Sequence, residues 1–168
     1  DKRKIFMDKN DYLRFIHDLY EFNNVKPAPE FSRRFQPKNV GDRDSHIEQA
    51  REQLVNIHAF VQMFNHYHLL VEQLTENGIS LFMKKLNIGY AMAFNLKQER
   101  SGYLFQGRFK DVHIGDDRQL AYLICYIHAN SLDIWKPKWK EKKLTGIEIK
   151  KALKFLENYR WSSHLDYL

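Results

Sequence analysis

Cysteine is almost absent from this sequence, which has a single one, Cys125, among 168 residues. One thiol cannot form an internal disulfide, and it excludes the cysteine-rich metal sites of zinc fingers. Proline is sparse too. Three of the four prolines lie between residues 27 and 37, where we predict an irregular segment that extends to about residue 44.

Long apolar runs are also missing. No stretch approaches the roughly 18 apolar residues of a membrane span, and the charged opening Asp1–Lys4 is not followed by a run of signal-peptide type. We therefore expect a cytoplasmic protein with no membrane partner. The chain begins at Asp1 without a methionine, so we also expect that residues of the natural start are missing.

What the sequence does contain is apolar and basic. Apolar residues make up 43% and aromatic residues 14%, enough to build the core of one domain. Lysine and arginine number 27 against 21 acids, giving a formal charge of +6. This excess favours a polyanionic partner, although it does not name one.

Hydrophobic periodicity divides the chain into helices and strands. Two β-rich runs joined around Phe64 and Asn65 predict a hairpin, and Ser45 and Thr145 each begin a capping-box pattern. The predicted helices are 8–23 (with Asn10 or Asp11 as cap), 45–53, 78–97, 116–130 and 145–158, and the predicted strands are 55–63, 67–73 and 112–114.

Two histidines, His66 and His68, are one residue apart on the second predicted strand. The two-residue period of a strand directs both imidazoles to the same face, which would form half of a metal site. With no cysteine ligand, such a site has nitrogen and oxygen donors, compatible with Mg, Mn or Zn. By itself the pair is a weak signal, because ordinary half-buried histidines are commoner.

A second group lies on the helix predicted at 116–130. Tyr126 and Asn130 are four residues apart and share a face, while Tyr122 lies one turn earlier on that face. Spacing does not choose between the two tyrosines. On spacing alone, a structural aromatic whose hydroxyl group lies at the surface is the favoured explanation of Tyr126.

Four blocks resemble a known family in their order and spacing: Phe64–Val71, Ser101–Lys110, Tyr126–Asn130 and Trp161–Ser163. They are similar to REP-associated tyrosine transposases and related insertion-sequence transposases, the single-tyrosine HUH group. The resemblance covers roughly Lys4 to Ser163. It implies an α+β fold with an antiparallel sheet of ferredoxin-like type, packed helices, and the catalytic tyrosine on a helix of the C-terminal half.

The resemblance also implies roles for individual residues. His66 and His68 would bind a divalent metal, Mg or Mn, with Asn130 as third ligand, and Tyr126 rather than Tyr122 would be the nucleophile. Attack on a phosphodiester would give a 5′-phosphotyrosine and a free 3′-hydroxyl. The expected substrate is single-stranded or hairpin DNA, and the resemblance leaves monomer and homodimer open.

The chain departs from the family at three places. Phe64 replaces a usual proline, Ala129-Asn130-Ser131 replaces Leu-Asn-Pro, and the family's first strand would precede residue 1. We therefore expect residues 1–168 to form a single HUH domain without that strand. A differently shaped turn and helix end are expected as well.

Basic and aromatic residues outside the motif centre are candidates for DNA contact, because aromatic rings stack on bases and cations follow phosphates. A solvated basic loop is the competing explanation. The candidates are Phe105, Gln106, Arg108, Lys110, Arg33, Arg34, Lys84 and Lys85, with Lys136, Lys138 and Lys140 as weaker ones.

Two other functions stay open: a domesticated protein that binds hairpin DNA without catalysis, and a metal-dependent phosphoesterase. The first would use the same surface without forming a covalent adduct. The second would keep the histidine pair but give Tyr126 no role.

Overall fold

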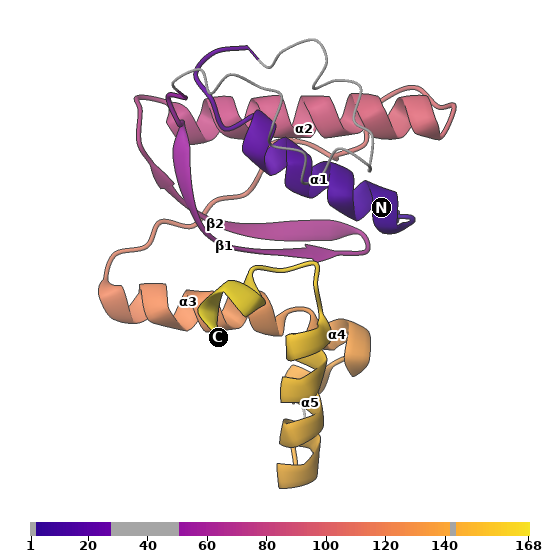
Figure 1. Cartoon of the computed structure of the whole chain (residues 1–168), viewed down its shortest axis with the longest axis vertical. Helices are drawn as coiled ribbons and strands as arrows, with labels where there is room; N and C mark the ends of the chain where they lie inside the picture. The colour runs from indigo at the N-terminus through magenta and orange to yellow at the C-terminus, as the bar shows by residue number, and fades with distance from the viewer. Residues whose placement is uncertain (1–2, 28–50, 142–143) are drawn as a thin grey trace, which may run out of the picture. The chain divides into compact units, whose positions relative to one another are not determined.

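The computed structural model describes residues 3–27, 51–141 and 144–168, which belong to two compact units (Figure 1). One unit comprises Asp1–Asn56 and Glu72–Lys110, and the other comprises Ile57–Val71 and Asp111–Leu168. The α+β class is confirmed, since helices accompany a two-stranded antiparallel sheet within the described residues. No helix of the described chain is long and apolar enough to cross a membrane.

The predicted hairpin is confirmed. Strand β1 spans Val55–Met63 and strand β2 spans His66–Gln73, so the turn falls at Phe64 and Asn65 as expected. Both units contribute to it, because the first residues of β1 and the last residues of β2 belong to the first unit.

Two other sequence predictions have different outcomes. The strand expected at 112–114 is wrong: this segment has no strand structure, and its Val112 side chain is 79% exposed. Three residues are too few to form a strand without a partner that covers them. The helix expected from Ser45 lies mostly outside the described residues, and residues 51–53 are not helical.

Helix α1, Lys9–Glu21, begins one or two residues before the predicted cap. Asp8 is the N-cap, and its carboxylate accepts hydrogen bonds from the backbone N–H groups of Asn10 and Asp11 at 2.9 and 3.2 Å. In turn, the Asp11 carboxylate accepts a hydrogen bond from the Asp8 N–H at 3.3 Å. An aspartate in place of the usual Glu or Gln closes this capping box, so the sequence signal was missed.

Helix α2, Gly78–Lys97, has the predicted bounds. It packs against α1 through aromatic rings, with the centroids of Phe15 and Tyr90 5.2 Å apart in an edge-to-face arrangement. Gly78 permits the helix to start close to the strand: a Cβ there would lie 2.3 Å from the Leu54 carbonyl oxygen. The glycine is therefore required by space rather than by its φ angle.

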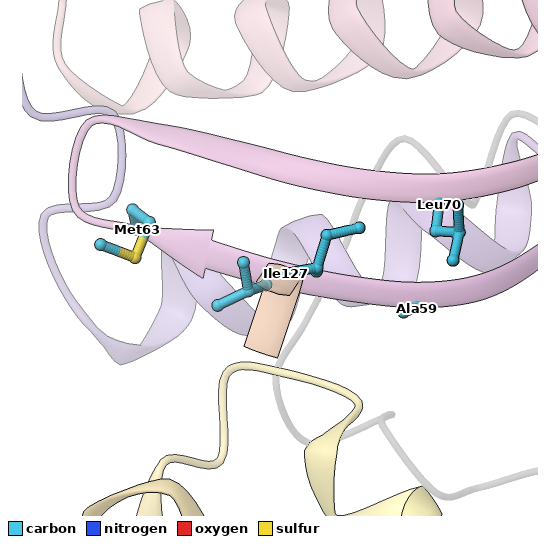
Figure 2. Packing of buried hydrophobic residues seen from close by; sticks show 5 residues of the cluster. Ala59, Met63, Leu70 and Ile127 are labelled. Atoms are coloured by element: carbon cyan, nitrogen blue, oxygen red, sulfur yellow. The ribbon is translucent and has the colours of Figure 1, made fainter. Parts of the chain in front are cut away.

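In the second unit, helix α3, Asp117–Ala129, lies over the hairpin. Asp116 caps it by accepting from the Gln119 N–H at 2.8 Å. Figure 2 shows Ile127 among the strand residues Ala59, Met63 and Leu70, with which it forms a buried apolar cluster. Ile127 thereby fixes the rotation of α3 on the sheet.

The remaining elements follow α3. They are α4 (Leu132–Trp135), the 3₁₀ helix η3 (Trp139–Glu141), α5 (Gly146–Asn158) and the 3₁₀ helix η4 (His164–Tyr167). The predicted Thr145 capping box is confirmed, since its hydroxyl accepts from the Glu148 N–H at 3.3 Å. Leu132, Ala152 and Leu156 join α4 to α5 in a small core.

The Trp-Ser-Ser block near the C-terminus has a structural role. Its backbone bridges β1 at Val61 and Ser162, and Ser163 exchanges hydrogen bonds with the backbone of Phe60. The Ser163 hydroxyl also lies 2.9 Å from Nε2 of the buried His128 on α3. One serine thus connects the edge of β1 to the helix that carries Tyr126.

Candidate active site

The histidine pair has the geometry that the strand period predicted. His66 and His68 lie on the same face of β2 as Leu70, and their ring centroids are 5.0 Å apart with the ring planes at 89°. Leu70 belongs to the cluster under α3 that Figure 2 shows. Both imidazoles therefore lie on the side of the hairpin that α3 covers.

Burial favours the neutral form of both histidines. The His66 Nδ1 lies 2.7 Å from the Asn65 side-chain oxygen, so Nδ1 carries the proton and the Nε2 lone pair is left for a ligand. Burial lowers the pKa of His66, although the Asp133 charge opposes this shift. Burial, then His66 and then Lys140 lower the pKa of His68 to about 4. Neutral imidazole is the form that binds metals.

Helix α3 presents Tyr126 and Asn130 on one face. Tyr126 is 36% exposed, and its ring stacks on that of the more exposed Tyr122 at 5.9 Å between centroids. Asn130 is buried, and its side-chain N–H donates to the Tyr126 carbonyl oxygen at 2.9 Å. Because this bond fixes the amide, the Asn130 oxygen remains as an acceptor.

The Asn130 side-chain oxygen already accepts a hydrogen bond from a charged group. The Lys140 ammonium on η3 donates to the Asn130 side-chain oxygen at 3.0 Å and lies 4.2 Å from the centroid of the Tyr126 ring. Its charge also contributes to the low pKa of His68. Strand β2, α3 and η3 therefore share one electrostatic environment.

The donor set fits a divalent cation. Within the described residues no group of three or more His, Cys, Asp or Glu side chains could hold a metal ion, so the third donor that the family resemblance implies is the Asn130 oxygen. Two neutral imidazoles and one amide oxygen are nitrogen and oxygen donors of the kind that Mn accepts and Mg tolerates. His66, His68 and Asn130 are the residues that would hold it.

Four of the expected DNA-contact residues belong to the first unit rather than to the second. Phe105, Gln106, Arg108 and Lys110 belong to the first unit, in a segment without helix or strand, where all but the half-buried Phe105 are exposed. Their role in DNA binding stays a prediction. Arg33 and Arg34 lie outside the described residues.

The lysines on α2 differ from one another. Lys84 is exposed, whereas the Lys85 ammonium donates to the backbone carbonyls of Asn24, Val25 and Lys26. A lysine that donates to three backbone carbonyls has little capacity left for a phosphate. Lys85 thus has a structural use that its sequence context did not indicate.

Sequence reasoning treated Lys140 as a weak DNA-contact candidate and did not consider Asp133. Neither residue belongs to a periodic pattern, because both follow the end of α3 in short helical turns. The His128–Ser163 bond was also missed, although both residues lie inside the motif blocks. The occurrence of His128 and Ser163 in two of the four motif blocks was the sequence feature that could have indicated their contact.

Comparison with known proteins gives one match. The family model described as "Transposase IS200 like" matches residues 42–130, which include the histidine pair, Tyr126 and Asn130. No curated protein and no solved structure matches the chain.

Proposed function

The chain belongs to the IS200-like transposase family, and from this premise we propose that it cleaves and rejoins single-stranded or hairpin DNA with Tyr126 as nucleophile. Family membership indicates a transposase whose partner is DNA. The single-tyrosine mechanism and the metal requirement are the steps that we add.

One observation carries the proposal: the exposed phenol and the neutral histidine pair belong to the same compact unit and are joined through one cation. Lys140 contacts the ring of Tyr126 and the oxygen of Asn130, and its charge reaches His68. A phosphoesterase would need the histidines but would leave an exposed phenol beside them unused.

The chemistry follows from these groups. The Tyr126 oxygen would attack the scissile phosphorus, the 3′-oxygen would leave and take up a proton, and the 5′-phosphate would remain on the tyrosine. A 3′-hydroxyl of another strand would reverse these steps and release the phenol, so no external energy source is needed. Bound Mg or Mn would supply Lewis-acid stabilisation of the charge developing on the phosphate.

The chain's own residues prepare this step. Ile127 and the His128–Ser163 bond fix α3 on the hairpin, so the Tyr126 ring has a defined position. The Asn130 side-chain N–H donates to the Tyr126 backbone carbonyl, which couples the nucleophile to a ligand one turn away. Positioning of this kind lowers the entropic part of the barrier.

The test is a covalent adduct. The full chain is incubated with Mg or Mn and a labelled hairpin that has single-stranded flanks, and the products are separated on a denaturing gel. We expect a DNA-linked protein band whose linked peptide, identified by mass spectrometry, contains the phosphate on Tyr126 rather than Tyr122. Retarded DNA without an adduct would favour binding alone, and hydrolysis without an adduct would favour a phosphoesterase.

A further inference from the structure

Lys140 is a basic residue in contact with both the proposed nucleophile and a proposed ligand. Its ammonium lies 3.0 Å from the Asn130 oxygen and 4.2 Å from the Tyr126 ring centroid, on a 3₁₀ turn ten residues beyond Asn130. It therefore contacts two side chains of the proposed mechanism at once.

Its partners differ from those of the neighbouring lysines. Lys136 forms an ion pair with Glu148, and Lys138 lies 3.9 Å from Glu141. No carboxylate of the described residues lies within ion-pair distance of Lys140, whose partners are the uncharged amide of Asn130 and the rings of Tyr126 and Trp139. Neutral partners bind an exposed ammonium weakly, so this cation can leave at little cost.

We propose that Lys140 is a built-in cation that occupies the Asn130 oxygen until a divalent metal takes its place. This inference rests on the proposed function, because it assumes that Asn130 is a metal ligand. A monovalent and a divalent cation on one amide oxygen repel each other strongly, so binding of the metal requires the ammonium to withdraw. Without metal, Lys140 keeps Asn130 and Tyr126 in place as a positioning residue.

The first measurement is metal affinity in the absence of DNA. Mn²⁺ is titrated into the full chain, and the free ion is followed by electron paramagnetic resonance. Removing the competing charge in Lys140→Met should tighten Mn²⁺ binding by roughly threefold to thirtyfold. The matched control Lys138→Met, on an exposed neighbour, should change the dissociation constant by less than about twofold.

The second measurement is thermal stability with and without Mn²⁺. Lys140→Met should lower the Tm of the metal-free protein by about 1–3 °C, because the contacts to Asn130 and Tyr126 are lost. The Mn²⁺-saturated variant should melt no lower than the saturated parent, because the ammonium has already withdrawn there. Lys140→Arg should behave like the parent in both measurements.

The outcomes distinguish a wrong role for Lys140 from a wrong metal site. If Mn²⁺ binds the parent and His68→Ala abolishes binding, but Lys140→Met leaves the affinity unchanged or weakens it, the role of Lys140 is wrong and the metal site stands. If the parent binds no Mn²⁺, or His68→Ala binds it equally well, the proposed metal site fails and the inference fails with it.

Discussion

Tyr90 on α2 and Tyr126 on α3 are both tyrosines of long helices, but their hydroxyl groups have opposite surroundings. Tyr90 is 1% exposed, its hydroxyl donates to the Ile5 carbonyl at 2.6 Å, and burial raises its pKa. Tyr126 is 36% exposed, and its hydroxyl forms no hydrogen bond within the part of the chain that the structure describes. The first phenol is used in a contact within the fold, and the second is the one that we propose as the nucleophile.

The same contrast extends to other polar groups of the two units. In the first, Lys97 pairs with Asp8 and Asp11, and Asn23 uses its whole amide on the backbone of Leu54 and Val55. In the second, His68 is held neutral in the fold. His68 is therefore a polar group that the fold keeps uncharged, whereas Lys97 and Asn23 are used in contacts that hold the first unit together.

The largest expected effect separates the two tyrosines by activity. Tyr126→Phe should reduce adduct formation and strand cleavage by at least about 1,000-fold, because the attacking oxygen is removed while the ring remains. Folding and DNA binding should be unchanged. The matched control is Tyr122→Phe on the stacked neighbouring ring, which should retain most of the activity. An adduct that survives in Tyr126→Phe would show that another nucleophile acts.

The next effect tests the histidine pair. His68→Ala should lower cleavage by about 100-fold or more, because a metal ligand is lost. Excess Mn should restore part of this activity by mass action, whereas it should not restore Tyr126→Phe. The exposed His113 offers a control, since His113→Ala should cleave like the parent. Equal rescue of both site variants by Mn would contradict the separate roles of metal and nucleophile.

A smaller effect, on stability rather than on activity, is expected when the buried Tyr90 is changed. Tyr90→Phe should lower the free energy of unfolding by about 1–3 kcal/mol, because the buried Ile5 carbonyl loses its donor. Cleavage per folded molecule should stay at the parental level. Urea denaturation followed by circular dichroism measures the change, and Tyr103→Phe at a 95% exposed position is the control. If Tyr90→Phe is as stable as the parent, the claim that the Tyr90 hydroxyl stabilises the fold is wrong.

Features of the fold and of the site that depend on nearby residues could be predicted from the sequence, whereas contacts between residues far apart in the chain could not. The hairpin and the bounds of α2 follow from local periodicity, and the shared face of His66 and His68 follows from the strand period. Lys140 could not be placed, because its contact with Asn130 depends on how two short turns reverse the chain. The strand expected at 112–114 failed because β pairing requires a partner that local sequence does not specify.

Acidification gives the smallest effect and tests whether the units respond separately. In the second unit the pKa values of His66, His68 and His128 are all lowered, chiefly by burial. The unfolded chain then binds protons first, so the stability contributed by His68 is complete above the ordinary histidine pKa of 6.5 and is lost as the pH falls towards the lowered pKa of about 4.

The first unit should respond at lower pH. In this unit the hydrogen bond from Lys97 lowers the pKa of Asp8 below 3.8. The stability that the Asp8–Lys97 pair contributes is therefore lost only as the pH falls through that lowered pKa. Hydrogen exchange at pH 7 and pH 5, corrected for the intrinsic rate, should therefore show loss of protection in α3, by about 1 kcal/mol after allowance for solvent screening. Helix α1 should keep its protection, and His68→Gln should reduce the loss in α3. Equal loss in α1 and α3 at pH 5 would mean that the two units open together, and the comparison between them would not hold.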